Sequence, residues 1–325
     1  MALSRLSTAI GQQLFTMPEG PVAVLRPVFG YDLSALPVEG TTILHGFRPD
    51  YEAWQASGYK VGSVDDVTTA AVALVVLPRS KSLGRALVAR AMQIAPFVLV
   101  DGQKTDGVDS LWREAKKRIG APSYLSKAHG RLFWLNSSDD FDDWRSPEPA
   151  PGEDGFVRLP GVFADGGADA GSVLLAEALP KKLPGKLADL GAGWGYLSAA
   201  ALTRTGVKSI DLIEAENIAL ACARANVTDE RAQFHWADAL SFQPAARYEG
   251  IICNPPFHTG RKADPGLGRA FIASAAKMMV ASGQLWLVAN RHLPYEATLG
   301  EHFRNVREFG GDNRYKLFHA TRPLR

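Results

Sequence analysis

Short apolar segments alternate with helix-like segments through the second half of the chain, and this alternation restricts the folds that the chain can adopt. The predicted strands span 185–190, 207–213, 231–236, 248–253 and 284–289, and the predicted helices span 196–205, 215–226 and 264–281. Short strands separated by helices favour a mostly parallel sheet with helices on both faces. The last two apolar segments, 306–309 and 315–320, flank a Gly-Gly-Asp-Asn turn and predict an antiparallel hairpin at the sheet edge.

The first half shows a weaker version of the same rhythm. Its predicted strands span 22–25, 41–44, 72–77 and 97–100, and its predicted helices span 50–57, 83–94 and 110–119. No glycine-rich turn follows the first of these strands, where the sequence reads RPVFGYDLSALP. We therefore expect two copies of one α/β plan, of which the N-terminal copy is degenerate and has lost its nucleotide site.

A proline-rich acidic segment, SPEPAPGED at 146–154, separates the halves. Closely spaced prolines disfavour both a packed helix and a central strand. We expect one domain over 1–147 and a second over 155–325, each long enough to bury its own core.

Composition excludes several classes of protein. Hydrophobic residues make up 46% of the 325 residues and charged residues 22%, which is typical of a globular protein and not of a disordered one. The two cysteines, Cys222 and Cys253, cannot form a disulfide framework and show no zinc-ligand spacing. The longest apolar run, 70–78, is shorter than the ~20 residues that span a bilayer. These observations predict a cytoplasmic protein without a metal or a membrane role.

The net charge of +2 is unevenly distributed. The segment 258–325 holds eleven Lys and Arg against five Asp and Glu, a surplus of +6, so the preceding residues carry −4. A basic C-terminal segment on a mildly acidic body is compatible with an anionic partner such as RNA, and also with ordinary surface charge.

A glycine-rich turn, Asp189-Leu-Gly-Ala-Gly-Trp-Gly195, lies between a predicted strand and a predicted helix. Gly191, Gly193 and Gly195 allow positive φ angles and let the backbone approach a ligand. The spacing differs from the NAD fingerprint G-x-G-x-x-G, and no Lys-Ser/Thr follows as in a P-loop. An acid at the strand end suits S-adenosylmethionine (SAM), whose ammonium group it can bind.

Two further acids follow the next two strands. Glu214 ends the second strand and can bind ribose hydroxyls, whereas Asp238, beside Ala239, follows the third strand and can accept from an adenine amino group. Acids at successive strand ends predict a cofactor lying across the carboxyl edge of the sheet.

The tetrapeptide Asn254-Pro255-Pro256-Phe257 follows the fourth strand. Adjacent prolines fix φ twice and remove two backbone donors, which favours a rigid turn. The Asn254 side-chain oxygen and the Pro255 carbonyl provide two acceptors for a planar amino group, and Phe257 provides a face on which a base can stack. This pattern predicts methyl transfer to an amine.

The second half resembles class I SAM-dependent methyltransferases that have an N-P-P-[FY] active site. More narrowly, it resembles the two-domain guanine-N2 methyltransferases of ribosomal RNA, the RsmC type of the MTS family. The segments that carry the resemblance are 159–175 (LPGVFADGGADAGSVLL), DLGAGWG, NPPFH, 287–295 (LVANRHLPY) and 313–320 (NRYKLFHA), and more weakly 77–81 and 141–145. Ala192 departs from relatives that often have cysteine there.

The resemblance implies two Rossmann-like domains and methylation of a guanine in 16S rRNA, in the 30S subunit, by a monomeric cytoplasmic enzyme. It implies that Asp169, together with the acids, the glycines, Ala239 and Asn254, lies at the cofactor, and that residues 254–257 align the base. Residues that we expect at the RNA are Phe163, Arg261, Lys262, Arg269, Arg314 and Lys316. We expect a positioning role for His258, because the product amine can lose its proton to water.

Other substrates also offer a planar amino group. The alternatives are a guanine in 23S rRNA, a release-factor glutamine, adenine N6 and cytosine N4. A non-catalytic RNA-binding assembly factor is a further alternative, although it would not require an intact glycine turn and N-P-P-F segment.

Overall fold

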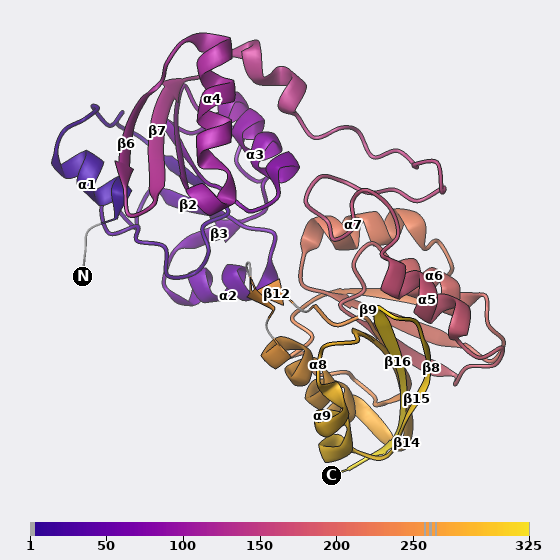
Figure 1. Ribbon diagram of the computed structural model, residues 1–325. Helices are drawn as coiled ribbons and strands as arrows, with labels where there is room; N and C mark the ends of the chain where they lie inside the picture. The colour runs from indigo at the N-terminus through magenta and orange to yellow at the C-terminus, as the bar shows by residue number, and fades with distance from the viewer. Residues whose placement is uncertain (1–3, 257, 260–261, 264, 325) are drawn as a thin grey trace. The chain divides into compact units, whose positions relative to one another are not determined.

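The computed structural model describes residues 4–256, 258–259, 262–263 and 265–324 (Figure 1). The chain divides into two compact units, which we call the N-terminal unit (Met1–Glu148) and the C-terminal unit (Pro149–Arg325). The division lies inside the proline-rich segment 146–154.

The C-terminal unit contains a seven-stranded mixed sheet of order β10-β9-β8-β11-β14-β16-β15. The strands are β8 (Lys186–Leu190), β9 (Ser209–Glu214), β10 (Ala232–Trp236), β11 (Tyr248–Cys253), β14 (Met279–Asn290), β15 (Phe303–Gly311) and β16 (Tyr315–Pro323). The first five in this order run parallel, and β16 is antiparallel to both neighbours. The helices are α5 (Ala170–Ala178), α6 (Tyr196–Leu202), α7 (Asn217–Asn226), α8 (Pro265–Met278) and α9 (Tyr295–His302). The predicted α/β class and C-terminal hairpin are confirmed.

The N-terminal unit repeats this plan with the order β3-β2-β1-β4-β5-β7-β6. Its strands are β1 (Val22–Leu25), β2 (Thr41–Leu44), β3 (Lys60–Gly62), β4 (Val72–Val76), β5 (Phe97–Gln103), β6 (Ser123–Lys127) and β7 (Gly130–Asn136). Its helices are α1 (Arg5–Gly11), α2 (Arg48–Ala56), α3 (Lys81–Ile94) and α4 (Val108–Ile119), with 3-10 turns η1 (Lys104–Asp106) and η2 (Asp139–Trp144). The short strands β12 (His258–Thr259) and β13 (Lys262–Ala263) form a separate pair. When only the strands of each seven-stranded sheet are numbered from the first one, the two orders are identical, as two copies of one plan require.

Strand register shows how the two copies correspond. Leu190 pairs with Ile213 and Cys253 in the C-terminal unit, and Leu25 pairs with Leu44 and Val75 in the N-terminal unit. Counting from these pairs, Val24 replaces Asp189, His45 replaces Glu214 and Val76 replaces Asn254. The N-terminal copy thus keeps the scaffold and lacks the polar side chains, which agrees with the expected degeneracy.

Helix α8 is shorter than the sequence predicts. It ends at Met278, and β14 begins at Met279, so that Ser282 and Gly283 lie inside the strand and not between helix and strand. The pairing of β11 with β14 is irregular here, moving from Tyr248–Met279 directly to Gly250–Gln284. Glycine is tolerated where strand pairing is irregular. Ser282 and Gly283 therefore lie within β14 and do not mark its beginning. The hairpin of β6 and β7 was also not predicted.

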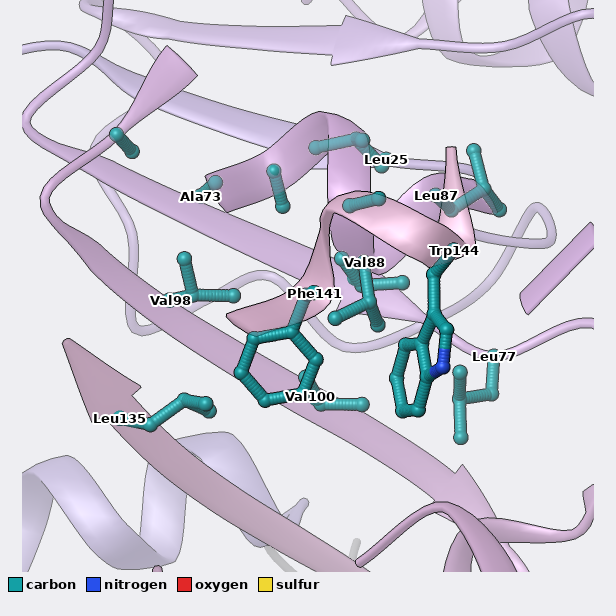
Figure 2. Close-up of a cluster of buried hydrophobic side chains, with 14 of the residues drawn as sticks. Leu25, Ala73, Leu77, Leu87, Val88, Val98, Val100, Leu135, Phe141 and Trp144 are labelled. Atoms are coloured by element: carbon teal, nitrogen blue, oxygen red, sulfur yellow. The ribbon is translucent and has the colours of Figure 1, made fainter. Parts of the chain in front are cut away.

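The turn η2 closes the core of the N-terminal unit. Phe141 and Trp144, 1% and 6% exposed, lie edge to face with ring centroids 5.0 Å apart. Figure 2 shows both rings among aliphatic side chains that include Leu77, Val88 and Val100, which belong to the same buried cluster. The segment that resembled the family by sequence therefore has a packing role.

Phe141→Ala should lower the free energy of unfolding of the N-terminal unit by about 3–5 kcal/mol, because it removes a buried aromatic ring. Urea unfolding of the full chain, with hydrogen exchange of the β5 amides to assign the loss, measures this change. Val28→Ala is the matched control, since Val28 is 64% exposed and its truncation should change stability by less than about 0.5 kcal/mol. Equal effects of the two substitutions would contradict the packing role.

Candidate active site

The glycine turn joins β8 to α6 at the carboxyl end of the parallel strands. Gly191, Gly193 and Gly195 have φ angles of +71°, +56° and +91°, a conformation that favours glycine. A Cβ at Gly195 would lie 2.9 Å from Val227 Cγ2, so α6 can begin this close to the end of α7 only with glycine. Glycine is therefore required both by the backbone conformation and by helix packing.

Asp189, the predicted ammonium-binding acid, is buried beneath this turn at 1% exposure. Its Oδ2 accepts from Ser198 Oγ at 2.7 Å, whereas its Oδ1 has no hydrogen-bond partner within the described ranges. Burial raises the pKa of Asp189 to about 7. An unsatisfied buried carboxyl oxygen is costly, and a cationic ligand group would compensate for that cost.

Glu214 holds the glycine turn from the end of β9. Its Oε2 accepts from the Gly193 N–H at 2.8 Å, and its Oε1 accepts from the Glu216 N–H at 2.7 Å. Burial raises the pKa of this carboxyl group as well. Each carboxylate oxygen retains acceptor capacity, so binding of ribose hydroxyls remains compatible with these contacts.

Asn254 follows β11 directly, and two side chains from the start of α5 fix its amide. Its Nδ2 donates to Asp169 Oδ2 at 3.0 Å and to Ser172 Oγ at 2.8 Å. Asp169 is also the N-cap of α5, where the same Oδ2 accepts from the Ser172 N–H at 3.1 Å. Asp169 therefore connects the helix start to the N-P-P-F segment.

These contacts determine which way the Asn254 amide points. An ionised carboxylate only accepts hydrogen bonds, so the atom facing Asp169 must be the amide nitrogen and not the oxygen. With both hydrogens of that nitrogen directed at Asp169 and Ser172, Asn254 Oδ1 is the part of the amide left to accept from a substrate. Sequence reasoning placed Asp169 at the cofactor and did not anticipate this contact.

The structure brings several of the predicted residues to one hollow. It is lined by Phe163, Ala164, Asp169, Ser172, Gly191, Ala192, Gly193, Trp194, Tyr196, Leu197 and Asn254. The hollow therefore joins the glycine turn, which we expect to bind the cofactor, to the amide of Asn254. Phe163, which is among its lining residues, is 56% exposed.

Trp194 was not predicted as a site residue, although it occupies a variable position of the glycine motif. Its indole N–H donates to the Phe163 carbonyl at 3.0 Å, while its ring is 4% exposed and packs against Phe156 and Tyr196. The indole therefore ties the segment that carries Phe163 to the glycine turn.

Asp238 and Ala239 lie after β10 and do not line this hollow. Asp238 is half-buried, and its Oδ1 accepts from the Leu240 N–H at 2.9 Å. The Ala239 side chain is buried in the core, and its carbonyl accepts from Ser274 Oγ at 2.6 Å. Only backbone atoms of Ala239 could therefore contact a cofactor.

Lys316 requires a correction. It was expected to contact RNA, but it is 6% exposed, donates to the Leu293 carbonyl at 3.1 Å and forms an ion pair with Glu296. A lysine held in this way cannot reach a phosphate, so we remove it from the RNA contacts.

The other basic residues fall into two groups. Arg269 and Arg314 are exposed, and the Arg314 guanidinium lies 5.3 Å from the centre of the Tyr315 ring. Phe257 and Arg261 lie outside the described residues, as do the side chains of His258 and Lys262. No described helix has the length and hydrophobicity to cross a membrane, and the described residues contain no cluster of metal-ligand side chains.

The family model for the methyltransferase small domain matches residues 153–319. The ribosomal RNA small subunit methyltransferase C of Hahella chejuensis is 32% identical over 248 residues, covering 73% of this chain and 72% of that protein. The protein of the same name from Shewanella halifaxensis is 30% identical and covers 75% of each chain.

A solved structure extends the likeness to both units. It is the T. Thermophilus 16S rRNA N2 methyltransferase RsmC in complex with AdoMet and guanosine, with a TM-score of 0.78 and 23% identity. The match covers 95% of this chain and 90% of that one, and it shows that the two-unit fold is shared. By the family model and the sequence relatives, the chain belongs to the methyltransferase small domain family, in the group of ribosomal RNA small subunit methyltransferase C.

Proposed function

We propose that this protein transfers a methyl group from SAM to the exocyclic N2 amine of a guanine in 16S rRNA. The observation that carries the proposal is the fixed amide of Asn254, whose free acceptor lies in one hollow with the glycine turn. The relatives named for the ribosomal small subunit, and a solved relative of the same fold holding AdoMet and guanosine, support this substrate over the other amines.

The residues at the glycine turn fit SAM. The unpartnered Oδ1 of Asp189 suits an ammonium group, Glu214 suits the ribose hydroxyls, and Asp238 suits the adenine amino group. SAM supplies an electrophilic methyl group on a sulfonium. The chain's own contribution here is to bind and orient, with the three glycines allowing backbone contact.

The Asn254 segment acts on the amine. Asn254 Oδ1 and the Pro255 carbonyl accept the two N–H bonds, which turns the nitrogen lone pair out of the base plane and toward the methyl donor. Both acceptors also stabilise the positive charge that develops on nitrogen, and they need no reorganisation because Asp169 and Ser172 hold the amide beforehand. We assign Phe257 to stacking on the base, and Phe163, Arg261, Lys262, Arg269 and Arg314 to the RNA.

The biological setting follows from this substrate. A 16S rRNA guanine is presented by the 30S subunit or its precursor, so we place the enzyme in the cytoplasm, acting as a monomer. The N-terminal unit, which lacks the polar residues of a cofactor site, serves RNA docking or supports the catalytic unit.

Radiolabel from SAM should enter 16S rRNA when 30S subunits, 50S subunits, naked rRNA and release factor are offered side by side. Mass mapping of the labelled nucleotide should give N2-methylguanosine. Label confined to 50S subunits would move the target to 23S rRNA, and label confined to release factor would overturn the proposal.

Asn254→Ala should abolish transfer and leave the Kd for SAM nearly unchanged, because its oxygen acts only on the amine. Ser172→Ala, which removes one of two amide contacts and keeps the Asp169 cap, should lower kcat by about tenfold or less, since a hydrogen bond contributes roughly 0.5–1.5 kcal/mol. Single-turnover kinetics and calorimetry of SAM binding measure both quantities. Full activity of Asn254→Ala would show that the amine is held elsewhere.

SAM affinity should fall as the pH drops below about 7, because burial raises the pKa of Asp189 to about 7 and protonation removes the charge that binds the ammonium. The sign is set by the ligand, since a cation binds the ionised form more tightly than the neutral form. Asp189→Asn should bind SAM more weakly at pH above this value and lose most of the pH dependence. An unchanged pH dependence in Asp189→Asn would assign the ammonium to another group.

A further inference from the structure

The C-terminal unit has a second cavity, of about 990 Å³, at the opposite end of its sheet. It opens beside the start of β11 and β14, where Gly250 pairs with Gln284, whereas Asn254 follows the far end of β11. Its lining comes from the end of α5 and the segment that follows it, from β11 and β14, and from the C-terminal hairpin. The aromatic and hydrogen-bonding side chains of the lining include Lys182, Gln284, Trp286, Arg307, Phe309 and His319.

Three rings form the apolar part of the cavity. The His319 imidazole stacks on the Trp286 indole, with centroids 5.2 Å apart and planes at 23°, and Phe309 meets His319 edge to face at 6.3 Å. Trp286 is 3% exposed and forms part of the cavity wall, so the His319 and Phe309 rings supply most of the apolar surface that a ligand could contact.

The polar part of the cavity consists mainly of donors. Arg307 Nε donates to His319 Nδ1 at 3.3 Å, and His319 Nε2 lies 3.0 Å from Gln284 Oε1, so the proton of the neutral imidazole is on Nε2. Burial and the Arg307 charge lower the pKa of His319, which agrees with the neutral form. The Gln284 amide nitrogen, the terminal Arg307 nitrogens and Lys182 Nζ remain available to an acceptor or an anion.

The only acid in the lining is already engaged. Glu249 Oε2 accepts from the Gly185 N–H at 2.7 Å and from the Lys186 N–H at 3.3 Å. The cavity therefore combines flat apolar walls with a surplus of donors and positive charge.

The N-terminal unit shows what this place in the fold can accommodate. Counting from the pairs Val75–Val100 and Cys253–Leu287, Trp286 corresponds to Leu99, and their antiparallel partners His319 and Trp134 correspond to each other. In the N-terminal unit the segment after α1 inserts Phe15, whose ring lies 4.9 Å from Trp134 and 5.6 Å from Phe97.

The segment after α5 supplies no such ring. It contributes Pro180, Lys182 and Leu183 to the lining, and the space that Phe15 fills in one copy is left as a cavity in the other. An inserted planar ring is thus the shape that this position of the scaffold accepts.

We propose that this cavity binds a nucleotide of single-stranded RNA, with its base against the Trp286–His319–Phe309 rings and its phosphate at Arg307 and Lys182. A planar base can stack against the aromatic wall, its acceptor atoms can accept from the Gln284 amide, and the phosphate can pair with the two cations. The choice of an RNA strand over a free nucleotide rests on the proposed function. The cavity would bind the RNA at a second point, at the start of β11, whereas the reacting guanine would lie beyond the end of that strand.

The test is binding of a fluorescent single-stranded RNA oligonucleotide to the full chain at fixed salt and without SAM, followed by anisotropy. Phe309→Ala should weaken binding by about fivefold or more, the loss of one base–aromatic stack. Arg307→Ala should weaken it by about tenfold, the loss of a charge-assisted contact. Arg304→Ala is the matched control, because Arg304 is exposed on the same strand and does not line the cavity.

Ser282→Trp, which fills the cavity and keeps its charges, should weaken RNA binding as Phe309→Ala does. In 30S methylation these variants should raise KM and leave kcat and the Kd for SAM unchanged. In a second arm, nucleoside monophosphates compete with the labelled RNA, and displacement that Arg307→Ala abolishes would identify a free nucleotide as the ligand. Unchanged RNA binding in Phe309→Ala, Arg307→Ala and Ser282→Trp would overturn the proposal, whereas loss of methylation with intact cavity-dependent binding would overturn only the proposed function.

Discussion

The parallel pairing of β8 with β9 on one side and β11 on the other is the constraint on which the site depends. Because Leu190 lies level with both Ile213 and Cys253, the segments that follow these residues emerge at the same edge of the sheet. This brings together the glycine turn, the Glu214 carboxyl and the Asn254 amide, although none of them is close to another in sequence. The helices add Ser172 of α5 and Ser198 of α6, whose hydroxyl groups hydrogen-bond the Asn254 amide and the Asp189 carboxyl group.

The N-terminal unit shows that this register does not by itself make a site. It has the same strand order and equivalent pairs, yet apolar Val24 and Val76 stand where the C-terminal unit has Asp189 and Asn254. At the position of Glu214 it has His45, which is 1% exposed and whose pKa burial lowers to about 3. A neutral buried imidazole cannot replace a carboxylate, so function depends on the side chains and not on the fold.

Many of the strands and the glycine turn could be predicted from local sequence. The strands 22–25, 41–44 and 248–253 have the predicted bounds, because short apolar runs between turn residues define strands well. The glycine spacing predicted a tight turn after β8, and all three glycines have the positive φ angles that other residues avoid. The predicted boundary between α8 and β14 was wrong. Gly283 usually would mark a break between elements, but here it lies within the irregular first part of β14.

Contacts between distant segments could not be predicted. Asn254 and Asp169 are 85 positions apart, and nothing in either motif specifies that one orients the other. The same limit explains Lys316, a basic side chain that we expected at the RNA and that instead pairs with Glu296 of α9. Spacing within a motif reports local conformation, whereas burial and pairing depend on the whole sheet.

The double use of Asp169 has a consequence for how this protein can vary. One carboxyl oxygen both caps α5 and accepts from the Asn254 amide, so a substitution there changes the stability of the helix start and the orientation of the amide together. Asparagine, which keeps the capping ability, could present its own N–H groups to the amide nitrogen and favour the opposite amide orientation. The same oxygen atom therefore serves folding and the site. A substitution that preserves the helix cap can still change the orientation of the Asn254 amide.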